Sequence, residues 1–296
     1  QVVWIEYVLK GILQDDTIKI AHNAPFEVEW FADYYGPEVV NHHAWECTQL
    51  QAHFLDERKG AGRDDYNANP FHSLDFLCKT YFGLAFKGLF KLDKKDMGNQ
   101  DLTETLIYNG VDTYQTLRLW HYQNKLLKQR GLYDVYKKSV WRQPTVALMQ
   151  LLGMPVDQNR VKEFQNKLSL ELQQIDTDIK GLDVVKKFIQ DKGSFNPAGE
   201  DAITLFRDYL KRKEIQVQDG KQLRWSVDKN VLDKIDHPLA KLIIKHRNVT
   251  KMKSTYVDEL ELGHGKYIYP DGSIHCNFNT TFTTTGRTSS SSPNMQ

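Results

Sequence analysis

Three side chains in the first half of the sequence could together activate a water molecule on a bound metal ion. Tyr108 and Asp112 are four residues apart within "YNGVDT", a spacing that puts both on one face of a helix. Glu27 lies in "AHNAPFE", where a strand-like run gives way to a helix. A carboxylate holds a divalent ion, and a phenol beside it orients the attacking water. We therefore consider metal-dependent hydrolysis, with Glu27, Tyr108 and Asp112 as candidate catalytic residues and the two carboxylates as candidate metal ligands.

Each of these patterns also has an ordinary structural interpretation. A Tyr/Asp pair at this spacing usually decorates a helix surface, and an acidic residue in a first helical turn is favoured by the helix dipole. Two-metal nucleases hold their ions about 3.5–4 Å apart, which requires several carboxylates in one cleft. Taken alone, the two stretches do not distinguish a hydrolase from a solvated surface.

The elements that must position these residues follow from apolar spacing and capping residues. "TIKIAH" is typical of a short strand, and "APFEVEWFADYYG" has helical spacing that ends at Gly36. Ser73 is a candidate N-cap for a helix in "HSLDFLCKTYFG", and a long helix is predicted from about Leu102 to Lys128. Alternating strand and helix signals predict an α/β domain over residues 1–132.

The sequence changes character after Gly131. Apolar residues recur every three or four positions in "NRVKEFQNKLSLELQQIDTDIKGL" and in the segments after it, as in amphipathic helices. Strand patterns return in "KYIYPDGSIHCNF", where Pro270-Asp271-Gly272 separates two β-type runs as a hairpin turn does. The sequence therefore predicts an all-helical region at 133–262 and the opening β-hairpin of a new sheet at 263–296.

Composition is that of an ordinary globular protein without a membrane span. The 296 residues are 26% charged and 40% hydrophobic, with a formal net charge of +1, so nucleic-acid binding would have to come from local clusters. Apolar runs are short and interrupted by charge, and the first residues lack the pattern of a signal peptide. Three widely spaced cysteines match no zinc pattern, and we expect them to be reduced thiols of a cytoplasmic protein.

The order of the motifs in the first half resembles the 3′–5′ proofreading exonuclease domain of family A DNA polymerases. A strand leading into "HNAPFE", a helical "HSL" and "YNGVD" on a long helix carry the resemblance. It implies a ribonuclease H-like fold and bound Mg²⁺ or Mn²⁺. Glu27 would take the second-motif carboxylate position, where Asp is commoner, and Asp112 would be the third-motif metal ligand. Tyr108 would position the water, and His22 and Asn23 would shape the second motif.

The family's first motif, an Asp-x-Glu on an opening strand, has no counterpart in the residues before Glu27. Asp15 and Asp16 are adjacent rather than spaced and are typical of a turn. The catalytic aspartates of the palm are likewise missing. We therefore expect that residues 1–296 by themselves neither extend a primer nor degrade DNA.

The helical region resembles the polymerase thumb of the same family, in the same order along the chain. "LLGMPVD" matches the turn between the first two thumb helices, and "FNPAGEDAITLF" matches the thumb tip, although Gly199-Glu200-Asp201 replaces its usual pattern. "HRNVTKMKSTYVDEL" matches the helix that follows the minor groove of primer–template DNA. A solvated basic face is the ordinary alternative for such a charge run. The resemblance implies DNA contacts from Arg247, Lys251, Lys253, Ser254 and Tyr256.

The last stretch, "TTTGRTSSSSPNMQ", resembles a family signature, T-G-R-x-S-S-x-x-P-N-x-Q, that opens the polymerase palm. By composition alone the same stretch would be a polar tail. The resemblance implies DNA contacts from Thr285, Arg287, Asn294 and Gln296. The resemblance also implies that Arg287 approaches the primer terminus through the minor groove, where a cationic donor is sensitive to base-pair shape.

Three functions are compatible with these features. The one we favour is the exonuclease and thumb portion of a family A DNA-directed DNA polymerase, a nucleotidyltransferase of replication or repair that is most like bacteriophage-type members. Palm and fingers would then lie on the same or a separate chain, and the location would be cytoplasmic, in the host if the source is viral. The alternatives are a non-catalytic duplex-binding subunit beside a separate polymerase chain and a free-standing 3′–5′ exonuclease. The expected domains are an exonuclease-like domain at 1–132, a thumb at 133–262 and the start of the palm at 263–296.

Overall fold

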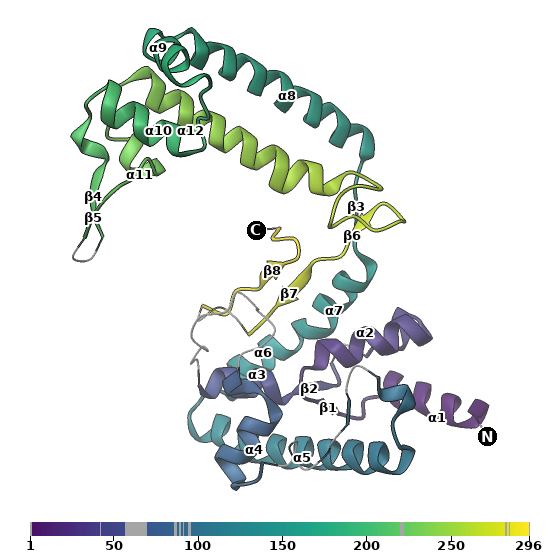
Figure 1. The fold of residues 1–296 in the computed structure, drawn as a ribbon. Coiled ribbons are helices and arrows are strands. Elements are labelled where there is room, and N and C mark those ends of the chain that lie inside the picture. Colours follow the sequence, from purple (N-terminus) through teal and green to yellow (C-terminus); the bar gives the residue numbers. More distant parts are fainter. Residues whose placement is uncertain are drawn as a thin grey trace. The chain divides into compact units, whose positions relative to one another are not determined.

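The computed structural model describes residues 2–41, 43–56, 70–85, 88, 90, 92–93, 96–219, 222–281, 283 and 285–295. The chain divides into two compact units (Figure 1). Unit 1 comprises Gln1–Met154 and His275–Gln296, and unit 2 comprises Pro155–Ile274. These units reflect packing and not function, so the three domains expected from the sequence stay a prediction.

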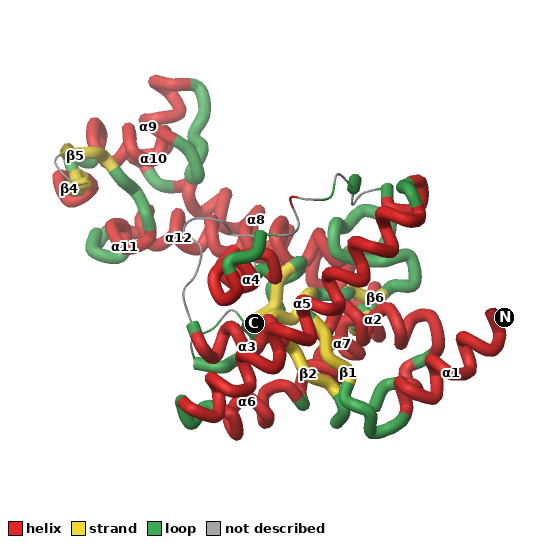
Figure 2. Tube along the Cα trace, turned by 90° about the horizontal axis from the view of Figure 1, so that it is seen from below, coloured by secondary structure: helices red, strands yellow, loops and turns green. Residues whose placement is uncertain are grey.

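A parallel pair of short strands lies among the helices of unit 1 (Figure 2). β1 (Lys19–Ala21) pairs with β2 (Trp45–Cys47), and Ile20 is opposite Glu46. Parallel strands need a crossover connection, which contains α2 (Ala24–Tyr35). The strand and the helix predicted at this point are confirmed. Gly36 ends α2 with a φ of 97°, a conformation that favours glycine.

The two other helices predicted in the first half are also confirmed. α4 (Leu74–Phe82) is capped by Ser73, whose hydroxyl accepts a hydrogen bond from the Phe76 amide. α5 (Leu102–Gln129) is the longest helix in the described residues, and Asp101 caps its first turn by accepting from the Glu104 amide at 2.8 Å. Both caps satisfy amides that the helix itself leaves without partners.

The remaining helices of unit 1 enclose the strands. They are α1 (Val2–Gln14), α3 (Thr48–Leu55), α6 (Tyr133–Val140) and α7 (Arg142–Leu152), with short 3-10 turns η1 (Pro37–Val39), η2 (Pro70–His72) and η4 (Met97–Asn99). Their core includes the buried residues Leu13, Val28, Val39, Trp45, Leu50, Leu127, Tyr136, Val140 and Ala147. This core draws on α6 and α7 as well as on the first 132 residues.

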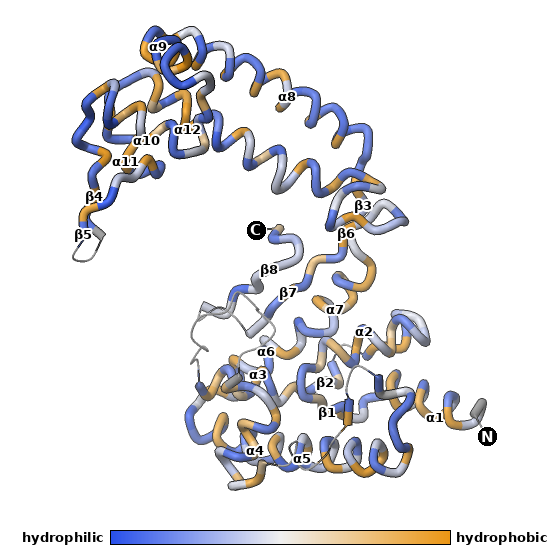
Figure 3. Tube along the Cα trace, in the orientation of Figure 1, coloured by the Kyte–Doolittle hydropathy of each residue, from blue (hydrophilic) through white to orange (hydrophobic). Residues whose placement is uncertain are grey.

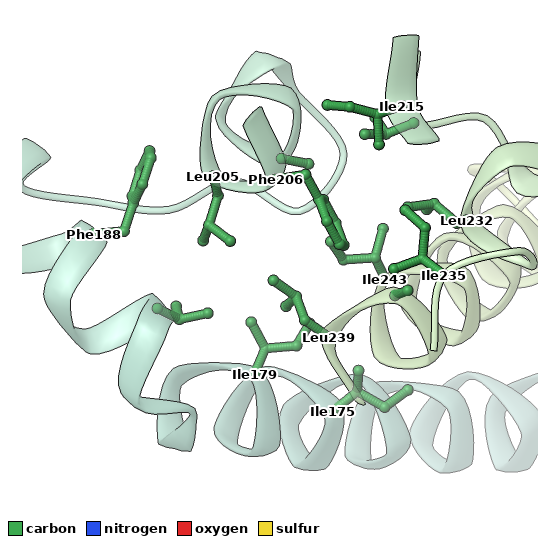
Figure 4. Packing of buried hydrophobic residues seen from close by; sticks show 14 of the residues in the cluster. Ile175, Ile179, Phe188, Leu205, Phe206, Ile215, Leu232, Ile235, Leu239 and Ile243 are labelled. Atoms are coloured by element: carbon green, nitrogen blue, oxygen red, sulfur yellow. The ribbon is translucent and has the colours of Figure 1, made fainter. Parts of the chain in front are cut away.

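Unit 2 is organised around two long helices that lie side by side, α8 (Gln158–Gly181) and α12 (Pro238–Lys251) (Figure 1). Lys245 on α12 pairs with Glu171 on α8 at 3.0 Å. Apolar and polar residues alternate along both helices at helical spacing (Figure 3). Between them and α9 (Asp183–Lys192) lies a core that contains Ile175, Ile179, Phe188, Leu205, Phe206, Leu239 and Ile243 (Figure 4).

The all-helical prediction for 133–262 is wrong at two places. One is the two-residue strand β3 (Met154–Pro155), and the other is an antiparallel pair of β4 (Gln216–Asp219) and β5 (Gln222–Trp225), with Gln216 opposite Trp225. The sequence does carry a hairpin signal at the second place, because Asp219-Gly220 stands between alternating apolar residues. Smaller elements complete the unit: α10 (Glu200–Thr204), α11 (Lys229–Leu232), the π-helical segments η5 (Leu205–Tyr209) and η7 (Met252–Val257), and the 3-10 turns η6 (Lys213–Ile215) and η8 (Asp258–Leu260).

The C-terminal part contains the predicted turn and a further strand pair. The Tyr269 amide donates to the Ser273 carbonyl at 2.8 Å around Gly272, which has a φ of 80°, so the hairpin turn is confirmed. β3 (Met154–Pro155) and β6 (Ser273–Ile274) are two residues each. Beyond them, β7 (Asn277–Asn279) pairs antiparallel with β8 (Ser289–Ser291), with Phe278 opposite Ser290.

Across the described part of the chain, no helix combines the length and the apolar character needed to span a membrane.

Candidate functional site

Glu27 is positioned by a sharp turn between β1 and α2. Asn23 provides the turn in the left-handed conformation, with a φ of 82°, which Asn adopts more readily than most residues. Pro25 follows in the first turn of the helix, where its missing amide hydrogen costs nothing. Ala24 and Val28 are fully buried, so the start of α2 is fixed against the core. Glu27 therefore projects from the first turn of a helix that cannot easily rotate.

Asp112 and Tyr108 lie one turn apart on α5. Tyr108 is 8% exposed, and its ring makes an edge contact with Phe90, with 5.3 Å between centroids. The same helical face continues to Thr116, which is also buried. The i, i+4 relation predicted from "YNGVDT" is thus present in the fold.

Glu27 and Asp112 line one cleft, which has a volume of about 310 Å³. Its walls come from the end of β1, the first turn of α2, the start of α4 and the middle of α5. The lining residues are Ile20, Ala21, His22, Glu27, Leu74, Asp112, Thr113 and Thr116. The structure therefore brings together the two carboxylates that the sequence proposed as metal ligands. Tyr108 is one turn away along α5 and is not among the residues that line the cleft.

The environment of Glu27 suits a cation. Its Oε2 atom is buried and has no hydrogen-bond partner within the described part of the chain. Burial raises the pKa of Glu27 to about 7, and a hydrogen bond to its own backbone offsets only part of this effect. A buried carboxylate oxygen without a donor is the kind of group that a divalent ion satisfies. The donor set fits such an ion in part, since the described residues contain no cluster of three or more His, Cys, Asp or Glu side chains able to hold a metal.

The cleft also contains His22, which the sequence analysis named, and two threonines, which it did not. The His22 Nδ1 atom lies 2.8 Å from the Thr48 hydroxyl, which fixes the ring at the end of β1. Thr113 and Thr116 extend the polar wall of α5 beyond Asp112. The i+4 position of Thr116 relative to Asp112 was a usable signal, because it puts the threonine on the same helical face.

Arg247 uses its guanidinium inside unit 2. Its Nη1 donates to the Val227 carbonyl at 2.6 Å, and Nη2 and Nε donate to the Pro197 carbonyl at 3.0 and 3.3 Å. Burial lowers the pKa of Arg247 below its usual value, and Asp228 offsets part of that change. Arg247 therefore ties two loops to α12 in this structure.

The other basic residues of the same stretch differ in their surroundings. Lys251 is exposed at the end of α12, where η7 begins. Lys253 is paired with Asp258, at 2.9 and 3.0 Å to the two carboxylate oxygens. Ser254 donates to the Thr250 carbonyl at 2.9 Å, and Tyr256 is half exposed. Lys251 has the surroundings that a phosphate contact needs, whereas Lys253 would first have to leave its carboxylate.

The C-terminal stretch, which by composition alone would be a polar tail, is folded where the structure describes it. Thr285 and Arg287 are exposed in the connection between β7 and β8. Gly286 has a φ of 69°, and its carbonyl accepts from Arg142 Nη2 at 3.3 Å. Asn294 is exposed and contacts the Ser290 hydroxyl at 3.4 Å. Gln296 lies outside the described residues.

Two family models match successive parts of the chain. Residues 158–296 match the family model described as DNA polymerase family A, and residues 2–128 match that of 3′-5′ exonuclease. The chain belongs to the family A DNA polymerases. DNA polymerase I of Synechocystis is 31% identical over 317 residues, which cover 98% of this chain and 29% of the relative. The DNA polymerase of Escherichia phage T5 is 28% identical, over 96% of this chain and 34% of its own length.

A solved structure shows the same fold at low sequence identity. The POL domain of Pol1 from M. smegmatis, in complex with DNA primer-template and dNTP, has a TM-score of 0.65 and 20% identity. The likeness covers 98% of this chain and 44% of that one. The chain spans about a third of the length of the Synechocystis and phage T5 polymerases.

Proposed function

We propose that this chain is the proofreading and primer–template-binding part of a DNA-directed DNA polymerase, with a ribonuclease H-like exonuclease domain at 1–132, a thumb at 133–262 and the start of the palm at 263–296. The observation that carries the proposal is the shared cleft of Glu27 and Asp112. They come from different elements, 85 positions apart, at the places where the exonuclease motifs have their carboxylates.

The residues of the cleft have separable roles in 3′–5′ trimming. Glu27 and Asp112 would hold Mg²⁺ or Mn²⁺ through their carboxylate oxygens. When bound, such an ion supplies Lewis-acid stabilisation and lowers the pKa of a coordinated water. Tyr108 does not line the cleft in this structure, so to orient that water its ring would have to leave the edge contact with Phe90 and turn toward Asp112. A metal ion binds the ionised carboxylate, and the buried carboxyl of Glu27 has a pKa of about 7. Glu27 therefore has to lose a proton near neutral pH when the ion binds.

DNA contacts are proposed on two parts of the chain, each considered by itself: the end of α12 with η7 in unit 2, and the β7–β8 connection in unit 1. Lys251, Ser254 and Tyr256 are exposed at the end of α12 and in η7, with Lys253 and Arg247 nearby in sequence. Arg287 and Thr285 are exposed in the β7–β8 connection, and we assign Arg287 to the minor groove at the primer end. The solved relative, which is a complex with DNA primer-template, supports primer–template binding by this fold. Asn294 and Gln296 complete the proposed contacts.

A metal titration tests the cleft without requiring catalysis. Mn²⁺ added to the ¹⁵N-labelled chain should broaden the amide signals of residues 20–28 and 108–116, because a paramagnetic ion relaxes nearby nuclei. Asp112→Asn should raise the Mn²⁺ concentration needed for half-broadening at least about tenfold, since one of the two proposed carboxylate ligands is lost. Asp134→Asn, an exposed acid on α6, is the matched control and should change nothing. Equal broadening in the wild type and Asp112→Asn would reject the metal site.

A further inference from the structure

A second carboxylate of unit 1 is buried outside the cleft. Glu46 is the middle residue of β2 and is 2% exposed. Removing an ionised carboxylate from water costs several kcal/mol unless partners replace the solvent. The partners of Glu46 therefore decide what this residue does.

Glu46 is bound by side chains of two different helices. Tyr136 Oη donates to Oε2 at 2.5 Å, and Lys137 Nζ donates to Oε1 at 2.5 Å, both from α6. Trp120 Nε1, from α5, donates to Oε2 at 3.3 Å. The Tyr136 oxygen also accepts from the Cys47 amide at 3.1 Å, which closes the network on β2. Burial raises the pKa of the Tyr136 phenol, so it stays a donor at neutral pH.

This network does not line the cleft, but it joins two of the elements that do, β1 through its partner strand β2, and α5. Ile20 is the β1 residue in register with Glu46, and it lines the cleft. Trp120 lies two turns after Asp112 on α5, about 12 Å along the helix axis. Thr116, which lines the cleft, lies between them. The hydrogen bond from Trp120 to Glu46 thus joins the helix that carries Asp112 to the strand pair that leads into Glu27.

We propose that Glu46 is a positioning residue, which holds α5 against the β1–β2 pair so that Asp112 stays opposite Glu27. The expected effect on metal binding rests on the proposed function. The expected effect on the position of α5 rests on the geometry alone. Apolar packing allows a helix to slide or rotate by small amounts. A directional hydrogen bond from Trp120 on α5 to a carboxylate that two α6 donors hold in place favours one position of α5. Groups bonded directly to a metal ligand commonly contribute a factor of about 10–100 in metal affinity, and we expect the lower end of this range for Glu46, which acts through α5.

Trp120→Phe is the sharpest variant, because it removes the link to α5 and leaves both α6 donors on Glu46. The matched control is Trp141→Phe, a half-exposed tryptophan outside the network. A second variant, Glu46→Gln with Lys137→Met, removes both charges together and avoids an unpaired buried ion. Thermal unfolding identifies any variant that fails to fold.

Two measurements separate this inference from the proposed function. Spin labels at Trp30 on α2 and Tyr114 on α5, both exposed, report the position of α5 without metal. Trp120→Phe and the double variant should shift or broaden the distance distribution, and Trp141→Phe should not. In the Mn²⁺ titration, half-broadening should need about tenfold more Mn²⁺ in the two network variants.

An unchanged distance distribution in both folded network variants would overturn the positioning role, whatever the metal does. Changed distances with wild-type Mn²⁺ affinity would overturn it as well, because α5 would then move without consequence for the cleft. Absence of any Asp112-dependent Mn²⁺ binding in the wild type would count against the proposed function alone. The distance measurement would still decide whether Glu46 positions α5.

Discussion

At the scale of single residues, Glu27 experiences two opposing effects. Its place in the first turn of α2 favours the anion through the helix dipole, while burial in the cleft disfavours it. Burial is the stronger effect, because the pKa of Glu27 rises to about 7. The folded chain then binds this proton more tightly than the unfolded chain, whose carboxyl has a pKa of 4.5. The stabilisation is therefore complete at low pH and is lost as pH rises between these two values.

This linkage predicts a pH-dependent stability that Glu27→Gln removes. Without divalent ions, the contribution of Glu27 to the free energy of unfolding should fall by up to about 3 kcal/mol as the pH rises from near 4.5 to above 7. The variant should lack this loss, because an amide does not ionise. Urea unfolding with EDTA at pH 5, 6, 7 and 8 measures both, with the exposed Glu163→Gln as control. Parallel profiles for the wild type and Glu27→Gln would contradict the burial of this carboxyl.

Lys251 provides the residue-scale test of DNA binding. An exposed ammonium at the end of α12 should contact a phosphate and carry no sequence information. Lys251→Ala should weaken duplex binding equally across sequences and lower the salt slope by about 1. Lys241→Ala, an exposed lysine near the start of the same helix, should leave the slope unchanged. Fluorescence anisotropy between 50 and 300 mM salt measures both, and equal slopes for the two variants would remove Lys251 from the interface.

At the scale of elements, Arg247 connects the loops of unit 2. Because its guanidinium donates to the carbonyls of Pro197 and Val227, Arg247→Met leaves two partly buried acceptors without a donor. The free energy of unfolding should fall by about 1.5–3 kcal/mol, the range for hydrogen bonds from charged groups. Arg160→Met is the control, because that arginine is exposed and forms a surface pair with Glu163. If both variants unfold at the same urea concentration, Arg247 does not hold these loops together.

Elements with local signals were predictable from the sequence, and those that depend on tertiary contacts were not. Ser73 and Gly36 mark helix ends through their own backbone and hydroxyl chemistry, and both ends are confirmed. β2 has only three residues, and its Glu46 is buried by partners about 90 positions away, which no local pattern reveals. Glu27 and Asp112 were identified by motif order, but their common cleft depends on how α2 and α5 pack. The β4–β5 pair was missed although Asp219-Gly220 signals it, because the surrounding helical periodicity dominated.

At the scale of the whole molecule, unit 1 is assembled from segments that are far apart in the sequence. The chain leaves it after Met154 and returns at His275, whose Nδ1 lies 2.8 Å from the Gln150 carbonyl. Phe278 on β7 then donates its amide to the Gln150 side chain. The segment that opens the proposed palm is therefore packed on α7, within the same unit as the proposed exonuclease cleft.

This assembly predicts that the exonuclease-like region does not fold well when it ends at residue 132. Tyr136 and Val140 on α6 are fully buried in the core of unit 1, and Ala147 on α7 joins them. A chain of residues 1–132 would expose that core and leave Glu46 without Lys137, an uncompensated buried charge. We expect it to bind a hydrophobic dye and to unfold without a cooperative transition, whereas residues 1–154 should retain a cooperative one. Urea unfolding followed by near-ultraviolet circular dichroism compares the two chains. Equal midpoints and equally steep transitions would show that α6 and α7 are dispensable, and that the domain ends where its sequence motifs end.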